Sequence, residues 1–444
     1  MSMPSTTWAK IVPATLALAL FASAGLRAQE RLGRPTQLPS VQPTAVRLTL
    51  DEAKQRVLAN SKLLGLATMN VAGKEIATRV VRADYFPQII GDSFYMQFDE
   101  PLGSILTIRG FPRAGIPGKQ VSANVLNENS TFTTVYAAQP ITALLKIRQG
   151  VTIARADEEI ARTQVEQAVR ALVSGVEQLF WGWLATQRIR AGAVQAVQGA
   201  EMLAKIDTPE TRIALLEAKQ GLQEVDNQLA DLEAQLSDLL GLPRGTQYEL
   251  VEPALPLPQI QSAEELAEAA CANSPEVRAA QQDIIKARAA VAAAKVDYLP
   301  NLAVVAGYAN QTGADYMQQN FEYVGAIGSY TFFNWGKRRN TVRERENLVA
   351  LATLKVQQTE DEVRQKAMKA FREFEQHRAA LKLAEQMVQA RGEAAKAAQT
   401  PAAMQNPAPL IEATKKLGLA QVDLVKAELA YRVSAAQIMS MVGK

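Results

Sequence analysis

The stretch Ala272-Asn273-Ser274-Pro275 is followed by an alanine-rich run that ends at Asp297-Tyr298-Leu299-Pro300. Much earlier, Ala59-Asn60-Ser61 is followed in the same way by Asp84-Tyr85-Phe86-Pro87. Asn60 and Asn273 are separated by as many residues as Pro87 and Pro300, so the two copies align without a gap. Because proline disfavours helical geometry in the residue before it, each copy predicts a helix that ends near Tyr-x-Pro. The pattern indicates two internal repeats of one plan.

Each predicted helix is followed by β-prone segments. In residues 88–98, Ile90, Phe94 and Met96 share one parity, which is typical of a strand. We expect hairpins over residues 88–142 and 301–333, with a Gly-, Pro- and Asn-rich loop at 99–129 in the first. Strands of this length cross a bilayer when they tilt as part of a barrel.

Two long stretches without proline follow the hairpins, the first from about Lys146 to Ile206 and the second from Lys337 to Pro401. At 1.5 Å per residue, a helix of about 60 residues is about 90 Å long, which is too long for a globular domain. Asp207-Thr208-Pro209 turns the first rod back into a second helix that ends at Gly241. The pattern predicts two long, coiled-coil-like helical hairpins.

The N-terminus is typical of a cleaved secretory signal. Lys10 precedes a short apolar run, and small residues then provide cleavage sites after Ala24 or Ala28. The alternative is a buried N-terminal helix, but a polar, proline-bearing tail follows directly. The predicted organisation is a signal peptide (1–28), an N-terminal tail (29–47), a first repeat (48–242), a connector (243–260) and a second repeat (261–444).

Composition argues against several functions. The net charge is only +3, so nucleic acid is not an expected partner. Cys271 and His377 are the only residues of their types, which leaves little material for a disulfide, a metal centre or a nucleophile with its base. We therefore expect no enzyme activity, no cofactor and no metal. Phe180, Trp181 and Trp183 are interpreted as helix packing.

The repeated motifs resemble those of the TolC-type outer-membrane efflux protein family. They include Leu48-Thr49-Leu50-Asp51-Glu52, Ala59-Asn60-Ser61, Tyr85-Phe86-Pro87 and their partners in the second half. The order of helix, Tyr-x-Pro, hairpin, long helix, turn, helix and Leu-Gly occurs twice and covers essentially the whole chain after the signal.

This resemblance implies a mainly α-helical fold with a transmembrane β-barrel portion. Three protomers would each supply four strands to one shared barrel of 12 strands. The helical hairpins would continue it as a periplasmic α-barrel. The implied function is that of a trimeric outer-membrane channel, the passive exit duct of a tripartite efflux pump or type I secretion system, gated at its periplasmic helical end. Its implied partners are a periplasmic adaptor (membrane fusion) protein, an inner-membrane pump and outer-membrane lipid.

Two groups of charged residues are candidate functional sites. Asp207 lies at the predicted entrance, where three symmetry-related copies would form a carboxylate ring that favours cations, with Glu393 and Glu412 as further candidates. A helix-capping role for Asp207 is the alternative. The second group is basic and lies where the long helices begin, so we expect it at the membrane rim, near lipid phosphates, or else as ordinary solvated charge; it consists of Lys146, Arg148, Lys337, Arg338 and Arg339.

A different class of protein is the competing interpretation. The chain could be a soluble periplasmic coiled-coil scaffold whose β-prone segments are only loops. That interpretation predicts extraction without detergent and no channel activity.

Overall fold

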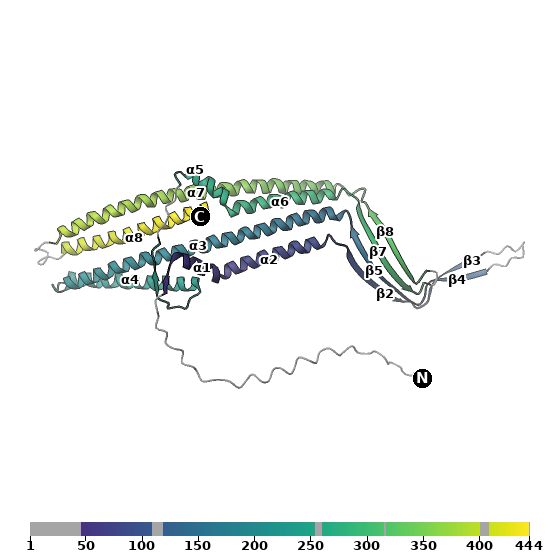
Figure 1. Ribbon diagram of the computed structural model, residues 1–444, viewed down its shortest axis with the longest axis horizontal. Coiled ribbons are helices and arrows are strands. Elements are labelled where there is room, and N and C mark those ends of the chain that lie inside the picture. Colours follow the sequence, from purple (N-terminus) through teal and green to yellow (C-terminus); the bar gives the residue numbers. More distant parts are fainter. Residues whose placement is uncertain (1–45, 109–118, 254–259, 315–316, 400–407, 444) are drawn as a thin grey trace, which may run out of the picture. The chain divides into compact units, whose positions relative to one another are not determined.

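The structure is a computed structural model that describes residues 46–108, 119–253, 260–314, 317–399 and 408–443. The predicted signal peptide and most of the N-terminal tail lie outside these residues. The described part contains eight α-helices and eight β-strands (Figure 1). The predicted fold class, mainly helical with a smaller strand portion, is confirmed.

Both halves of the described chain contain short helix, helix, paired strands, long helix and helix in the same order. The elements of the first half are β1 (Val46–Leu48), α1 (Leu50–Asn60), α2 (Lys62–Ala83), β2 (Gln88–Gln97), β3 (Leu102–Ile108), β4 (Lys119–Leu126), β5 (Asn129–Pro140), α3 (Ala143–Ala204) and α4 (Pro209–Leu240). Those of the second are β6 (Tyr248–Leu250), α5 (Ala263–Asn273), α6 (Pro275–Val296), β7 (Asn301–Thr312), β8 (Asn320–Ser329), α7 (Lys337–Ala397) and α8 (Ala408–Val442).

The helix that we expected before each Tyr-x-Pro is two helices. Ser61 and Ser274 adopt extended backbone angles and end one helix while they cap the next. The Ser61 hydroxyl accepts a hydrogen bond from the Leu64 amide, and the Ser274 hydroxyl accepts one from the Val277 amide, both at 3.2 Å. A serine cap satisfies an amide that has no partner within its own helix, which makes the break stable.

The asparagine of each repeated motif closes the far end of its own half. The Asn60 side chain donates to the Leu240 carbonyl at the end of α4, and Asn273 donates to the Val442 carbonyl at the end of α8, both at 3.1 Å. Last-turn carbonyls have no helical partner, so these amides satisfy them. Each asparagine also lies beside a left-handed glycine that ends the helix: Gly241 and Gly443 have φ of 68° and 84°.

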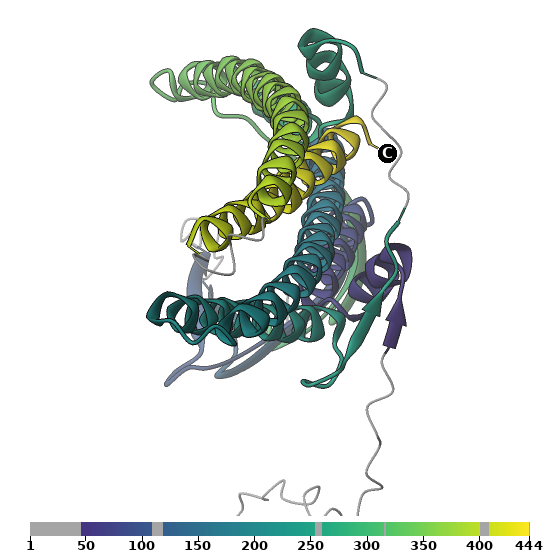
Figure 2. The same ribbon diagram turned by 90° about the vertical axis from the view of Figure 1, so that its left-hand side faces the viewer.

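Two apolar clusters hold the short helices against the long ones. In the first half, Val57 of α1 is buried with Phe180 of α3 and Leu240 of α4. In the second, Leu266 of α5 is buried with Ile438 of α8. Burial of a side chain of this size stabilises the fold by ~1.5–3 kcal/mol. Within residues 45–444, the long helices form a curved layer, and α1, α5 and the β1–β6 pair lie on one side of it (Figure 2).

The four longest strands form one antiparallel sheet in the order β2-β5-β7-β8. Strands β2 and β8 are its edges, and each half supplies one edge and one inner strand. The predicted first hairpin is correct in its outer strands, but the interval 99–129 is not merely a loop. It contains a second antiparallel pair, β3 and β4. The glycines and prolines that suggested a loop are concentrated in residues 110–118, and they obscured the β-prone runs on either side.

The long helices end close to where the sequence predicted. Helix α3 has 62 residues and α7 has 61, so each is about 92 Å long. In the described part of the chain, no helix is long and apolar enough to span a membrane.

The asparagine caps are expected to contribute measurably to stability. Asn273→Ala removes the amide that bonds a terminal carbonyl, which costs about 0.5–1.5 kcal/mol, and Asn60→Ala acts similarly in the first half. Circular dichroism should show a lower melting temperature for each variant. Asn70→Ala is the control, because Asn70 donates to the Gln164 side chain and not to a carbonyl at a helix end, and it should change stability by less than about 0.5 kcal/mol. Equal melting of all three variants would contradict the assigned role.

Candidate functional site

One face of the sheet carries an uninterrupted apolar row. Ile89, Ala137, Ala306 and Val324 are direct partners across all four strands, so their side chains share one face. At the two edges, 79% of Ile89 and 82% of Val324 is exposed. We call these four residues the apolar row. An exposed apolar face that runs from edge to edge of a sheet has no counterpart to pack on within the described chain.

The opposite face of the sheet is crowded. Gly307 lies between Tyr136 and Tyr323, and a Cβ atom at Gly307 would lie 2.6 Å from the Tyr136 Cβ and 2.9 Å from the Tyr323 ring. Asp92 belongs to the same face as these tyrosines. The two faces therefore differ at this level of the sheet: one exposes the apolar row, whereas the other packs tyrosines around a glycine.

Aromatic side chains mark both ends of the exposed face. Toward the β3–β4 end, the hydroxyls of Tyr95 and Tyr308 donate to Asn129 and Asn320, each at 2.8 Å. At the end next to the long helices, the segment 330–335 exposes four aromatic rings, including Phe332 (91% exposed) and Trp335 (88%). Trp335 has φ of 53°, a left-handed conformation that directs the chain into Gly336 and α7. Rings with a polar partner or a polar edge are typical of a membrane boundary.

The basic candidates lie in the first turns of α3 and α7, and they differ in their contacts. Lys146, in the first turns of α3, forms an ion pair with Asp297 at the end of α6. Arg338 donates to the Thr331 carbonyl at 2.8 Å, and its guanidinium lies 4.8 Å from the Tyr330 ring centre. Lys337 and Arg339 begin α7 beside it. Arg148 follows two residues after Lys146 in α3, where its carbonyl accepts from the Thr152 hydroxyl at 3.1 Å.

The acidic candidates belong to the opposite ends of the long helices. Asp207 lies between α3 and α4 with φ of 53°, and its carboxylate pairs with Arg212 at 3.0 Å. The alternative role of Asp207 as a helix cap is wrong, because the capping residue is Thr208, whose hydroxyl accepts from the Thr211 amide at 3.3 Å. Thr208 directly precedes Pro209, the first residue of α4, so its hydroxyl and not the Asp207 carboxylate takes the capping position.

Glu393 lies in the last two turns of α7, and Glu412 lies in the first two turns of α8. Glu393 accepts from Gln389 at 3.4 Å, and Glu412 pairs with Lys416 at 3.0 Å. The hydrogen bond from Lys416 and its charge lower the pKa of Glu412. One turn away, Lys415 pairs with Glu217 of α4 at 2.9 Å, so the ends of the two hairpins are in contact.

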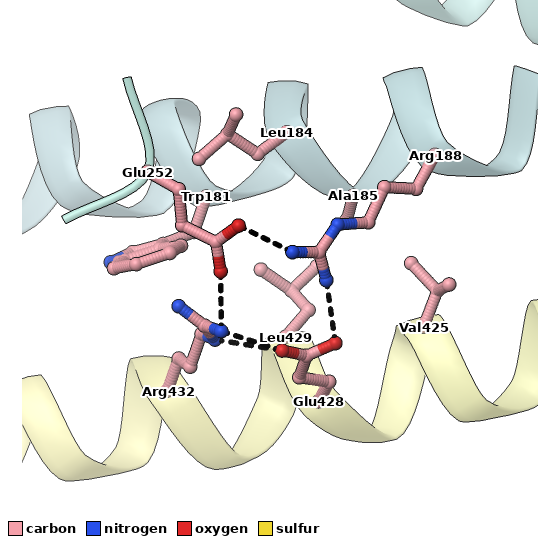
Figure 3. A pocket seen from close by; sticks show the side chains of 9 residues that line it. All are labelled: Trp181, Leu184, Ala185, Arg188, Glu252, Val425, Glu428, Leu429 and Arg432. Carbon is pink, nitrogen blue, oxygen red and sulfur yellow. Dashed lines mark hydrogen bonds and ion pairs between the residues drawn. The ribbon is translucent and has the colours of Figure 1, made fainter. Parts of the chain in front are cut away.

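A closed ring of four charges joins the two halves at the α3–α8 interface (Figure 3). Arg188 of α3 pairs with Glu252 at 2.5 Å and with Glu428 of α8 at 2.7 Å. Arg432 of α8 pairs with the same two carboxylates, each at 2.6 Å. We call these four residues the charge ring. Each charged side chain has two neighbours of opposite charge. Glu252 lies in the connector, directly after β6.

The charge ring rests on a buried aromatic side chain. The Arg432 guanidinium lies 4.5 Å from the Trp181 ring centre, and Trp181 is only 3% exposed. The pocket enclosed by these residues is about 20 Å³, which holds at most a water molecule. The ring therefore binds one part of the protein to another and is not a ligand site.

The contacts within the charge ring favour its charged form. Partial burial opposes ionisation of Glu252, but hydrogen bonds and charges from Arg188 and Arg432 outweigh it and lower the pKa of Glu252. The pKa of Arg188 is raised in spite of burial, because Glu252 and Glu428 surround it. The charges of Glu252 and Arg188 are thus retained at neutral pH.

Sequence reasoning missed the charge ring. The spacing of Glu428 and Arg432 on one helix face is readable, but it is also typical of ordinary solvated pairs. Arg188 is 64 residues from Glu252 and 240 from Glu428, and no local pattern connects them. The interpretation of Phe180, Trp181 and Trp183 as packing is confirmed, since all three are buried. Within the described ranges, no group of three or more His, Cys, Asp or Glu side chains is arranged to hold a metal ion.

Comparisons with known proteins agree with this architecture. Residues 266–444 match the sequence model of the outer membrane efflux protein family. A comparison with curated proteins finds no match.

Several solved structures share the fold at low sequence identity. The outer-membrane channel OprN is 15% identical, with a TM-score of 0.72 and coverage of 89% of each chain. The outer membrane protein VceC from Vibrio cholerae is 15% identical, with a TM-score of 0.70, and the match covers 89% of this chain and 96% of VceC. The CmeC outer membrane channel of Campylobacter jejuni is 14% identical, with a TM-score of 0.65 and coverage of 89% and 85%.

These matches confirm the resemblance that the repeated motifs indicated: the second half of the chain matches the outer membrane efflux protein family in sequence, and about nine-tenths of the chain has the fold of outer-membrane channels.

Proposed function

We propose that this protein is a trimeric outer-membrane channel that serves as the passive exit duct of a tripartite efflux pump or a type I secretion system. The apolar row is the observation that carries this proposal. In water such a row would be unfavourable, whereas in a bilayer it faces lipid, and strands of 10–12 residues are long enough to cross when tilted. The tyrosines and the aromatic segment 330–335 would then lie at the two membrane interfaces.

The open edges of the sheet support a ring of several copies. Backbone groups at β2 and β8 need partners, because lipid supplies none. If β8 of one protomer pairs with β2 of the next, the contact is head-to-tail and closes into a ring, and three copies of four strands give the 12-stranded barrel that the resemblance implies. Helix α2 has an apolar stripe available for the same contact, formed by the exposed side chains Leu66, Met69, Ile76 and Val80.

The helical hairpins support a periplasmic role. With the sheet in the outer membrane, α3–α4 and α7–α8 extend away from it on the side of the aromatic segment (Figure 1). Two helices of about 92 Å per protomer are long enough to carry a tube deep into the periplasm. We infer that the far ends meet an adaptor protein and an inner-membrane pump, which would supply the energy, and that rearrangement of these ends opens the duct.

The proposed function assigns a role to each group of charged candidates. Asp207, Glu393 and Glu412 belong to the hairpin ends and would line the entrance. The basic residues begin the long helices beside the aromatic segment, where phosphates of the inner leaflet would lie.

Val324→Lys tests whether lipid covers the apolar row. A lysine there would face hydrocarbon and cost about 2–4 kcal/mol at the bilayer centre, so folded trimer should decrease. Glu322→Lys is the matched control, because it changes an already charged residue on the same face of the same strand. Trimer yield would be measured by crosslinking in native membranes. If the protein extracts without detergent, forms no channels in planar bilayers and tolerates both substitutions equally, it is the soluble periplasmic scaffold instead.

Asp207→Asn should reduce the preference of the channel for cations. Three copies of this exposed carboxylate would favour cations at the entrance, and the asparagine keeps the shape without the charge. Reversal potentials across a salt gradient measure the preference. Asp361→Asn on the exposed surface of α7 serves as the control. Unchanged selectivity in Asp207→Asn excludes a selectivity ring.

Replacement of all five basic candidates by glutamine should reduce trimer yield and melting temperature in membranes that contain anionic lipid. The control removes five exposed cations farther along α7, namely Arg364, Lys366, Lys369, Arg372 and Arg378. Because Lys146 also contacts Asp297, a fourfold variant that keeps Lys146 separates lipid binding from that ion pair. Equal behaviour of the fourfold variant and the control would eliminate the lipid contact.

A further inference from the structure

The charge ring lies between two other sets of ion pairs that join the halves of the chain. Nearer the sheet, α3 is joined to α6 by ion pairs of Arg278 with Glu166 and of Lys286 with Asp157. Farther toward the hairpin ends, the ion pair of Lys415 with Glu217 joins the halves, and both of its side chains are more than half exposed. Among the described residues, the ring is therefore the last partly buried set of ion pairs between the halves before the hairpin ends.

The charge ring is better suited to hold two helices together than a single surface pair. An isolated exposed ion pair contributes about 0–1 kcal/mol, because water and side-chain entropy offset the attraction. Here each charge has two partners, Arg432 is only 21% exposed, and Trp181 covers its guanidinium. Arg188 is the one member of the ring on α3, so the whole connection of that helix to Glu252 and Glu428 depends on it.

We propose that the charge ring is a latch that holds α8 against α3 and so keeps the α7–α8 hairpin in its resting position. When the ring opens, α8 separates from α3, and the hairpin ends beyond it are free to move apart. Glu252 ties the connector between the halves to the same latch. The claim that this movement opens a duct rests on the proposed function.

The test removes the ion pairs of α3 without a change of net charge. Arg188→Gln with Glu428→Gln leaves the ion pair of Arg432 with Glu252 and the contact of Arg432 with Trp181, but no ion pair of the ring then reaches α3. The matched control is Arg190→Gln with Asp226→Asn. It breaks an ion pair of 2.6 Å on the same helix, but that pair joins α3 to α4 within the first half. Both double variants remove one positive and one negative charge.

Single-channel recording in planar bilayers should show that the latch variant is open roughly fivefold more of the time than the wild type, the lower end of a typical coupling between sites. The control should behave as the wild type. Reversal of all four signs, with Arg188→Glu, Glu252→Arg, Glu428→Arg and Arg432→Glu, restores alternation and should lower the open fraction again. Wild-type gating in the latch variant, or equal opening in the control, overturns the latch.

Hydrogen exchange separates this inference from the proposed function. Release of the latch should speed exchange of α8 amides around residues 425–432 in the latch variant and not in the control, whether or not the protein conducts. If the wild type forms no channel, the proposed function fails, and the exchange result still decides whether the ring holds α8. Unchanged exchange in the latch variant shows that the ring does not restrain the helix.

Discussion

The unpaired edges of the four-stranded sheet are the constraint on which the rest of the structure depends. The backbone amides and carbonyls that point outward from β2 and β8 need partners, and a sheet that faces hydrocarbon cannot obtain them from water. Closure with other copies is then the available solution. On the proposed function, the long helices that follow each strand pair would share this circular arrangement, and the curved layer of helices in one chain is consistent with a segment of a tube (Figure 2).

Much of the fold was predictable because its signals are local. Thr49 and Glu52 form the capping box that their spacing suggests, and Pro87 and Pro300 mark the ends of helices. The absence of proline over about 60 residues predicted α3 and α7 to within a few positions. These features depend on residues that are close in sequence, where backbone geometry leaves few alternatives.

Other features were not predictable because they depend on partners that are distant in sequence. The break at Ser61 has no proline to signal it, and its stability comes from packing and from the Asn60 amide at the end of α4. The charge ring needs three segments that periodicity treats independently. Asp207 has the residue type of a helix cap, yet Thr208 occupies the position. In each case several residues could satisfy the local rule, and tertiary structure selects one.

The two asparagine caps also have a consequence for the order of folding. Asn60 reaches a carbonyl 180 residues later, and Asn273 reaches one 169 residues later, but each contact stays inside its own half. A chain that emerges from its N-terminus can therefore complete the first half before the second has been delivered. The two halves thus contain two shorter closures in place of one that would span the whole chain.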